Sequence, residues 1–290
     1  MMPIVARTRL GLAAALRGLG SPVVLVPTMG ALHGGHRELI RQAREIASPN
    51  GSVVVSVFVN PLQFGAGEDL DRYPRTLDAD VVIAAEEGAD LVFAPSAAQM
   101  YPRPQLITLD PGPVGRILEG ESRPGHFSGV LTVVAKLLRL TRPDVAVFGE
   151  KDAQQLALVR RMSQDLDLGT EIVGVPTVRD ADGLAISSRN RFLSPAERRT
   201  ALLLPAALRA GQEAVHDGPA AVRKAAGEVL ATTADPALRL DYLALVDPDT
   251  FEDVGEDHAG PARLLVAARV GTTRLIDNTP LSLECHAADH

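Results

Sequence analysis

The sequence lacks several features that would assign it to a familiar class. Its single cysteine, Cys285, allows no internal disulfide and no cysteine-based zinc site. No apolar run reaches the roughly 18 residues of a membrane-spanning helix. The first twenty residues spread arginines along an Ala- and Leu-rich helical pattern, unlike the charged start and apolar core of a signal peptide. We therefore expect a cytoplasmic protein without a membrane partner.

Positive charge is also scarce. The chain has 29 Lys and Arg against 36 Asp and Glu, which gives a formal net charge of −7. It therefore lacks the broad basic field used in non-specific nucleic-acid binding, and we expect no nucleic-acid partner. With 46% hydrophobic residues among 290, the chain has enough apolar surface for one large domain or two smaller ones.

The first 177 residues alternate between patterns typical of buried strands and of amphipathic helices. The β-branched run 23–26, stopped by Pro27, predicts the first strand, and a helix follows the loop 28–35. Further strands are expected over 52–59, 91–94, 145–148 and 172–175, and further helices over 77–87 (with Thr76 as N-cap), 127–140 and 153–165. The Pro- and Gly-rich stretch 95–125 predicts irregular chain. This order indicates right-handed βαβ crossovers in an α/β fold, a Rossmann-like parallel sheet with helices on both faces.

A different pattern begins after Pro176. Ser194 to Glu197 is a capping box with proline at the first helical position, and Pro205 should kink or break the helix that begins there. Another helix is expected over 220–231, with short strands over 240–246, 263–268 and 275–276 and a turn at 270–273. We therefore expect a Rossmann-like domain over 1–177 and a smaller α+β domain over 178–290, with a disordered tail from 284.

Ligands of open parallel sheets bind beyond the carboxyl ends of the strands. Polar residues gather in three segments that follow expected strands, at 27–36, 60–64 and 149–155. In the first, Gly34 and Gly35 let helix N–H groups approach an anion, while His33 and His36 could donate hydrogen bonds to a phosphate. A metal site is less favoured, because the pair lacks both the i, i+4 spacing and an adjacent acid. A further interpretation is that the histidines only cap a loop. Neither a Walker A loop nor Gly-x-Gly-x-x-Gly is present.

Two other segments carry weaker signals. Lys151 follows a strand and suits a phosphate contact, with Asp152 suited to ribose hydroxyls, although a surface ion pair would look the same. The loop 183–190 combines two hydroxyls, a guanidinium and an amide that could surround phosphate oxygens. An ordinary turn before the capped helix would have a similar sequence.

Several blocks, in order, resemble one family. Residues 27–36 (PTMGALHGGH) are similar to the histidine motif of the nucleotidylyltransferase superfamily, in the version carried by the pantothenate synthetases, or pantoate–β-alanine ligases. The blocks that resemble that family's other motifs are 58–64 (FVNPLQF), 73–75 (YPR), 123–127 (RPGHF), 148–152 (FGEKD), 186–190 (ISSRN) and 271–278 (GTTRLIDN). Departures are limited to Ile186, where methionine is common, and Ala153, where an aromatic is common.

The resemblance implies a two-step ligase that uses ATP and Mg²⁺. The pantoate carboxylate would attack the α-phosphorus of ATP, and the β-alanine amine would then attack the pantoyl adenylate. The residues implied in ATP binding are Met29, Gly30, His33, His36, Gly149, Glu150, Lys151, Asp152, Val178, Ile186, Ser187, Ser188 and Arg189. Of these, the catalytic ones would be His33, His36, Lys151, Ser187 and Arg189, with His36 as the favoured proton donor. The substrate-binding residues would be Gln63 and Gln155 on pantoate, with Gln63 also orienting β-alanine, and Asn60, Tyr73 and Arg123 around them.

The resemblance also implies a homodimer formed through the larger domain, and a smaller domain that acts as a lid. Two alternatives stay open at this stage. One is a nucleotidylyltransferase that acts on a phosphorylated small molecule, which would call for cations where Gln63 and Gln155 stand. The other is a catalytically idle nucleotide-binding module.

Overall fold

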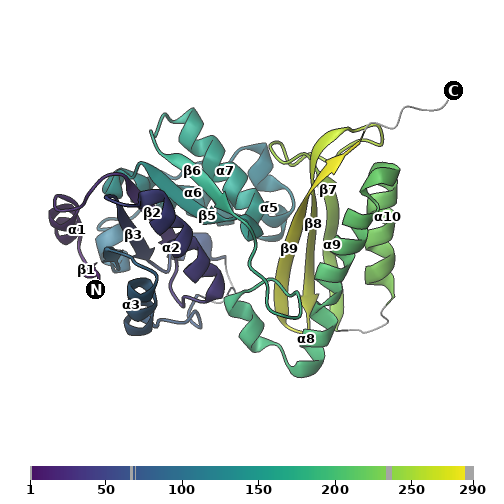
Figure 1. The fold of residues 1–290 in the computed structure, drawn as a ribbon, viewed down its shortest axis with the longest axis horizontal. Helices are drawn as coiled ribbons and strands as arrows, with labels where there is room; N and C mark the ends of the chain where they lie inside the picture. Colours follow the sequence, from purple (N-terminus) through teal and green to yellow (C-terminus); the bar gives the residue numbers. More distant parts are fainter. Residues whose placement is uncertain (1, 66–67, 69, 233–236, 285–290) are drawn as a thin grey trace. The chain divides into compact units, whose positions relative to one another are not determined.

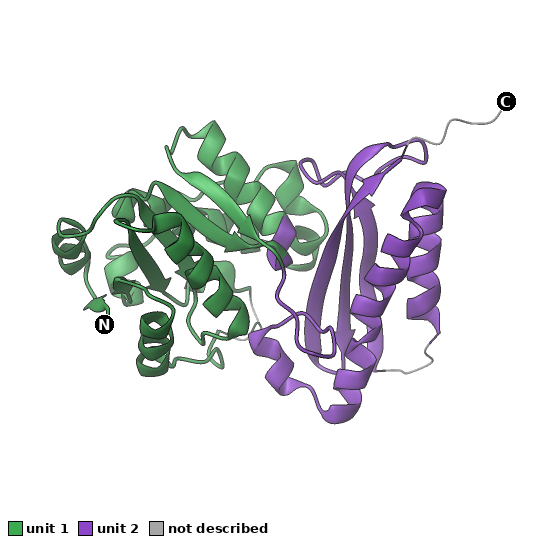
Figure 2. Cartoon of the chain, in the orientation of Figure 1, with its two compact units in different colours: residues 1–150, 154–176 green, residues 151–153, 177–290 purple. Residues whose placement is uncertain are grey.

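We analysed a computed structural model, which describes residues 2–65, 68, 70–232 and 237–284 (Figure 1). The expected disordered tail lies outside the described residues, apart from Glu284. The chain divides into two compact units, coloured separately in Figure 2. Unit 1 contains residues 1–150 and 154–176, and unit 2 contains residues 151–153 and 177–290. Lys151 therefore belongs to unit 2, although it follows a strand of unit 1 almost directly.

Unit 1 is built on a six-stranded parallel sheet, which confirms the predicted fold class. The strand order is β1-β4-β3-β2-β5-β6. The strands are β1 (Ile4–Ala6), β2 (Val23–Thr28), β3 (Ser52–Val57), β4 (Leu91–Phe93), β5 (Val145–Gly149) and β6 (Glu171–Val175). Strand β1 corrects the sequence-based prediction, which expected only helix before residue 20. Its three residues pair with β4 at the sheet edge. So short a strand does not show the alternation of apolar and polar residues by which a strand is predicted.

The end of β2 is a second correction, because the strand continues through Pro27 to Thr28. Thr28 accepts a hydrogen bond from Phe58 N–H through its carbonyl, so its backbone faces β3. Pro27, one residue earlier, faces β5, but the pairing of β2 with β5 stops at Leu25. Because β5 does not pair with β2 at that position, the proline needs no N–H to complete a hydrogen bond between the strands.

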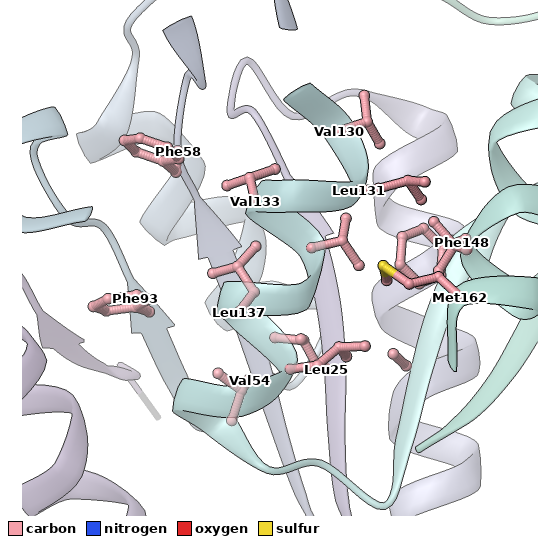
Figure 3. Close-up of a cluster of buried hydrophobic side chains, with 14 of the residues drawn as sticks. Leu25, Val54, Phe58, Phe93, Val130, Leu131, Val133, Leu137, Phe148 and Met162 are labelled. Carbon is pink, nitrogen blue, oxygen red and sulfur yellow. The ribbon is translucent and has the colours of Figure 1, made fainter. Parts of the chain in front are cut away.

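The strands bury alternate residues on the two faces of the sheet. Val24 and Val26 of β2 pack into one core beneath the α2 and α3 helices, while Leu25 between them packs into the other. Figure 3 shows the second core, where Leu25, Val54 and Phe148 lie close to Leu131 and Leu137 of α6. Burial on both faces explains why β2 and β3 are mostly apolar, with valine at successive positions and not only at alternate ones.

The helices of unit 1 agree with most of the predicted ranges. They are α1 (Arg9–Leu16), α2 (Gly34–Ala47), α3 (Leu77–Glu86), α4 (Ala97–Met100), α5 (Glu119–Ser122), α6 (His126–Thr141) and α7 (Ala153–Asp165), with 3₁₀ turns η1 (Pro61–Gln63), η2 (Pro113–Arg116) and η3 (Glu150–Asp152). The stretch 95–125, expected to be irregular, contains the short helices α4 and α5. Thr76 is the N-cap residue of α3 as predicted, but its hydroxyl bonds to the Asp80 carboxylate instead of capping an N–H.

Unit 2 packs helices on a three-stranded antiparallel sheet of order β7-β8-β9, which confirms the α+β prediction. Its elements are the 3₁₀ turn η4 (Ser188–Phe192), the helices α8 (Pro195–Ala201), α9 (Leu203–Glu213) and α10 (Gly218–Ala231), the 3₁₀ turn η5 (Val215–Asp217), and the strands β7 (Leu238–Val246), β8 (Gly260–Val270) and β9 (Thr273–Leu283). Ser194 and Glu197 form the predicted capping box. The break expected near Pro205 falls at Leu202, which leaves Pro205 in the first turn of α9, where no N–H partner is required. Strand β9 is far longer than the predicted 275–276.

Within the described part of the chain, no helix has both the length and the apolar character needed to cross a membrane.

Candidate active site

The sheet of unit 1 reverses its strand order between β2 and β5. Such a switch point is where open α/β sheets bind ligands, beyond the carboxyl ends of the strands. Leu25 pairs with Ala146, so three residues further on Thr28 of β2 is level with Gly149 of β5. Thr28 also pairs directly with Val57 of β3. The segments that follow these three strands therefore start from one edge of the sheet.

The turn after β2 is held by a buried carboxylate on α3. Asp80 accepts hydrogen bonds from Ala31 N–H (3.1 Å) and Leu32 N–H (2.8 Å), and it is 1% exposed. Gly30 has φ +82°, and a Cβ there would lie 2.9 Å from both the Asp80 carboxylate and a Val57 methyl group. The turn thus needs glycine at position 30 for its conformation and for the close approach.

The two histidines of this turn cap helix α2 reciprocally. His33 Nδ1 accepts from Gly35 N–H (3.2 Å), and His36 Nδ1 accepts from His33 N–H (3.3 Å). Their rings lie 4.1 Å apart between centroids. Both histidines therefore cap the helix through Nδ1. Because each Nδ1 accepts, the proton of a neutral ring must be on Nε2.

His36 is neutral at physiological pH. Burial, with a smaller contribution from His33, lowers the pKa of His36 to about 3. At neutral pH, His36 can donate a hydrogen bond from Nε2–H, but it carries no positive charge. Charge neutralisation at a bound polyphosphate would therefore depend on other side chains, such as lysine and arginine.

Gln63 is held from two sides in the turn η1. Its Oε1 accepts from Asn60 Nδ2 (3.1 Å), and its Nε2 lies 3.1 Å from the sulfur of Met29. Three predicted site residues, Met29, Asn60 and Gln63, are thus brought together. All polar atoms of the Asn60 side chain are bonded within the protein, and Asn60 is 1% exposed. Asn60 therefore supports Gln63 instead of offering polar atoms to a ligand.

Arg123 is engaged by protein groups. Its guanidinium makes a two-pronged pair with Glu68 (both 2.8 Å) and contacts His126 Nε2 at 2.9 Å. Since arginine only donates, His126 Nε2 accepts and its Nδ1–H donates to the Gln63 carbonyl (2.9 Å). The pairing with Arg123 lowers the pKa of Glu68 against the opposing effect of burial. Tyr73 is buried edge-on against Phe64, which follows Gln63.

The remaining predicted residues of unit 1 follow β5. Gly149 ends the strand, Glu150 begins η3, and Gln155 lies partly exposed in the first turn of α7. The neighbouring Gln154 has a different role. It is buried, and its amide bonds to Val114, Ile117 and Glu119 backbone atoms, which fixes the segment before α5.

Lys151 is anchored to β9 in unit 2. Its main-chain carbonyl accepts a hydrogen bond from Asn278 Nδ2 (2.9 Å), and Arg263 donates to Asn278 Oδ1 (2.6 Å). Asp152 follows Lys151 and is exposed. The contact fixes the backbone of Lys151.

The loop of Ser187, Ser188 and Arg189 follows a tight hairpin in unit 2. Arg179 pairs with Ala185, Ile186 N–H donates to the Val178 carbonyl (2.9 Å), and Gly183 turns the chain at φ +93°. Ser187 then caps η4 by accepting from Arg189 N–H (3.2 Å). Arg179 is fixed in turn by a two-pronged ion pair with the buried Asp277 (2.6 and 3.0 Å).

Three supporting residues were not identified from the sequence as site residues. These are Asp80, Asp277 and Tyr101, whose hydroxyl donates a hydrogen bond to Asn60 Oδ1 (2.8 Å). Asp80 lies four residues after a predicted N-cap, in the first turn of a helix, where acids are common for other reasons. Asp277 and Asn278 belong to a block that resembles the family, but no local pattern connects them to Lys151, far earlier in the chain.

Within the described ranges there is no group of three or more His, Cys, Asp or Glu side chains that could hold a metal ion.

A Rossmann-like sheet with a His-Gly-Gly-His turn at its switch point places the chain among the nucleotide-binding α/β proteins. Comparison with known proteins defines the family. The pantoate-beta-alanine ligase family model matches residues 5–280, so the chain belongs to that family. A pantothenate synthetase of Thermobifida fusca is 60% identical over 289 residues, which cover 97% of this chain and 96% of that protein.

Solved structures give the same assignment. A pantothenate synthetase of Thermus thermophilus is 48% identical with a TM-score of 0.88, and the match covers 95% of this chain and 98% of that one. A pantoate-beta-alanine ligase from Francisella tularensis, complexed with beta-gamma ATP and beta-alanine, is 34% identical with a TM-score of 0.77 over 96% and 97% of the two chains.

Proposed function

We propose that this chain is a pantoate–β-alanine ligase that forms pantothenate through a pantoyl adenylate. A pantoate carboxylate oxygen attacks the α-phosphorus of ATP, and the bond from that phosphorus to the bridging oxygen breaks to release pyrophosphate. The β-alanine amine then attacks the acyl carbon, AMP leaves, and the new amide nitrogen loses a proton. The observation that carries the proposal is the His33–His36 turn at the switch point of a chain that belongs to this family.

The first step needs alignment of two anions and neutralisation of charge, and no protein nucleophile. In unit 1 we assign the Nε2–H groups of His33 and His36 to ATP phosphate oxygens. Backbone groups of Met29, Gly30, Gly149 and Glu150 would hold the nucleotide. Gln63 and Gln155 are assigned to pantoate, while Tyr73 and Arg123 would lie around them.

In unit 2 the cations Lys151 and Arg189 are assigned to the phosphates, together with the hydroxyls of Ser187 and Ser188. Val178, Ile186 and Asp152 would contact the adenosine. These groups supply the positive charge that neutral His36 does not. The lid role of unit 2, which would keep water from the adenylate, stays a prediction.

Magnesium would reach the site with ATP. Held by the nucleotide, the ion would reduce the negative charge that the pantoate carboxylate has to approach. The cationic side chains of Lys151 and Arg189 would also act on the phosphates.

Isotope exchange tests the proposal. The protein is incubated with ATP, labelled pyrophosphate and Mg²⁺, with or without pantoate, and β-alanine is omitted. We expect label to enter ATP only when pantoate is present, because formation of the adenylate is reversible. Exchange that needs a phosphorylated acceptor, or no exchange at all, would exclude the adenylate route. Release of AMP only after β-alanine is added completes the test.

We also propose a homodimer, formed through unit 1. Leu106 and Ile107 are adjacent, and they are 91% and 79% exposed. Two large apolar side chains next to each other on a surface are suited to contact with a second copy. Sedimentation velocity should give the mass of a dimer, and L106D/I107D should give that of a monomer.

The cytoplasm is the compartment that we propose. One cysteine in 290 residues fits a reducing environment, where proteins do not depend on internal disulfides. Cell fractionation with an antibody against the protein tests this assignment.

A further inference from the structure

The side-chain amide of Asn60 has one allowed orientation. Leu62 N–H can only donate, so the Asn60 atom that lies 3.3 Å from it must be the oxygen. Asn60 Nδ2 then faces two acceptors, Gln63 Oε1 and the Gly129 carbonyl, each at 3.1 Å. Both donors and both acceptor positions of this buried amide are thus used.

The orientation of Asn60 determines that of Gln63. Because Asn60 Nδ2 donates, the Gln63 atom that it contacts must be the oxygen. The NH₂ group of Gln63 therefore points the other way, where it lies 3.1 Å from the sulfur of Met29. A thioether is a weak acceptor, so a substrate oxygen would replace it favourably.

Tyr101 completes the network from the end of the short helix α4. Its hydroxyl donates to Asn60 Oδ1 over 2.8 Å, the shortest hydrogen bond of that amide. The ring is fixed between Phe58, with centroids 6.1 Å apart, and Lys136, whose Nζ lies 4.8 Å from the ring centroid. Burial raises the pKa of Tyr101, so the phenol remains a donor throughout the working pH range.

Helix α6 provides another hydrogen-bond partner of Asn60, the Gly129 carbonyl. A Cβ on Gly129 would lie 2.2 Å from the Leu62 carbonyl oxygen, so only glycine lets the helix backbone approach η1 this closely. That approach puts the Gly129 carbonyl within reach of Asn60. The direction of the Gln63 amide is thus set by two elements, α4 and α6, which are distant from it in sequence.

We propose that Tyr101 is a positioning residue that acts through Asn60 to fix the amide direction of Gln63, so that Gln63 meets its substrate as a hydrogen-bond donor. This inference rests on the proposed function in one respect, the contact of Gln63 with pantoate. A donor suits the carboxylate and hydroxyl oxygens of pantoate and does not suit an ammonium group. The contact of Gln63 is therefore with pantoate oxygens and not with the β-alanine amine.

Steady-state kinetics of Tyr101→Phe test the positioning role. Loss of one neutral hydrogen bond should raise the KM for pantoate roughly five- to tenfold. The KM values for ATP and β-alanine should stay within about twofold, because Tyr101 has no part in holding them. Tyr242→Phe, which removes a tyrosine hydroxyl from β7 of unit 2, is the matched control and should leave all three KM values unchanged.

A double-mutant cycle separates positioning from a general structural effect. If Tyr101 acts through Gln63, Tyr101→Phe should have no further effect on the KM for pantoate in a Gln63→Ala background. Full additivity of the two changes would overturn the inference, as would a Tyr101→Phe variant with unchanged kinetics. Melting temperatures of all variants show whether an effect comes from unfolding.

Gln63→Glu tests the direction itself. The carboxylate still accepts from Asn60, but it presents an oxygen where the NH₂ group was. We expect a larger loss of pantoate use than in Gln63→Ala, and an equal or smaller loss would contradict the donor assignment. If Gln63→Ala leaves pantoate kinetics unchanged, the proposed contact of Gln63 with pantoate is wrong. If Gln63→Ala impairs pantoate use but Tyr101→Phe does not, only the proposed role of Tyr101 is rejected.

Discussion

Asn278 donates a hydrogen bond from its side-chain amide to the main-chain carbonyl of Lys151, 2.9 Å away, although the two residues are 127 positions apart in the chain. The preceding residue, Asp277, pairs with Arg179, which also donates to the Gly183 carbonyl within the hairpin before Ser187. Two adjacent residues of β9 therefore hold both Lys151 and the hairpin. Because all of them belong to unit 2, the phosphate-binding groups assigned to that unit share one support, strand β9.

We expect Asn278→Asp to lower kcat/KM for ATP about tenfold, the effect of losing one or two kcal/mol of positioning. Aspartate can still accept from Arg263, so this variant removes mainly the contact with the Lys151 carbonyl. Initial rates at varied ATP measure the effect, and Ser282→Ala, exposed on the same strand, is the control. Wild-type kinetics in Asn278→Asp would show that the backbone of Lys151 needs no such anchor.

His36 should remain neutral far below the pH at which an ordinary histidine is protonated. Its pKa is lowered to about 3 by burial and by His33, and its Nδ1 accepts from a backbone N–H. Nitrogen-resolved NMR at pH 7 should therefore show the Nε2–H tautomer, and the signal should not titrate between pH 8 and 5. His36→Gln assigns the signal by its loss. A midpoint near pH 6.5 would refute the neutral state of His36.

The lowered pKa of His36 also makes the stability of the folded protein depend on pH. The unfolded chain takes up a proton on His36 near pH 6.5, whereas the folded protein does so only near pH 3. The stabilisation of the native state associated with neutral His36 is therefore fully present above pH 6.5, and it falls as the pH drops towards 3. We expect the free energy of unfolding of His36→Gln to fall less steeply than that of the wild type over this range, as measured by urea titration at several pH values.

The sequence predicted the layout of unit 1 because its central strands are buried on both faces, which gives short unbroken apolar runs such as 53–55. It also located the histidine turn, since residues at the ends of parallel strands meet at one edge. The prediction failed where a neighbour decides the local structure. Pro27 stays in its strand only because β5 does not pair at that level, and no local pattern contains that information.

The supporting residues of the site could not be predicted from the sequence, for a related reason. Asp80 contacts a turn about 48 residues before it, and Tyr101 contacts a side chain 41 residues before it. Each is an ordinary residue in an ordinary segment, and Tyr101 lies in a stretch that composition predicted to be irregular. Their roles depend on packing between elements, which periodicity does not encode.

Loss of a phosphate donor should reduce turnover strongly. We expect Lys151→Ala and His33→Ala each to lower kcat on the order of 10²-fold or more, the usual effect of removing a donor that stabilises transition-state charge. Rates of pyrophosphate release at saturating substrates measure this effect. Lys224→Ala, on the exposed face of α10, removes a lysine away from the assigned residues as the control. Full activity in both variants would mean that the phosphate site is misplaced.

The histidine turn should lose its order when Asp80 is changed. Asp80→Asn keeps the volume, but its NH₂ group would face a backbone N–H of Ala31 or Leu32, so one donor loses its partner at a cost of about 1–3 kcal/mol. We therefore expect a lower melting temperature and a KM for ATP raised several-fold, because His33 and Gly30 depend on this turn. Asp78→Asn is the matched control, since it changes the net charge equally from an exposed position on the same helix. Thermal unfolding and ATP kinetics that do not differ between the two variants would show that the turn is held without Asp80.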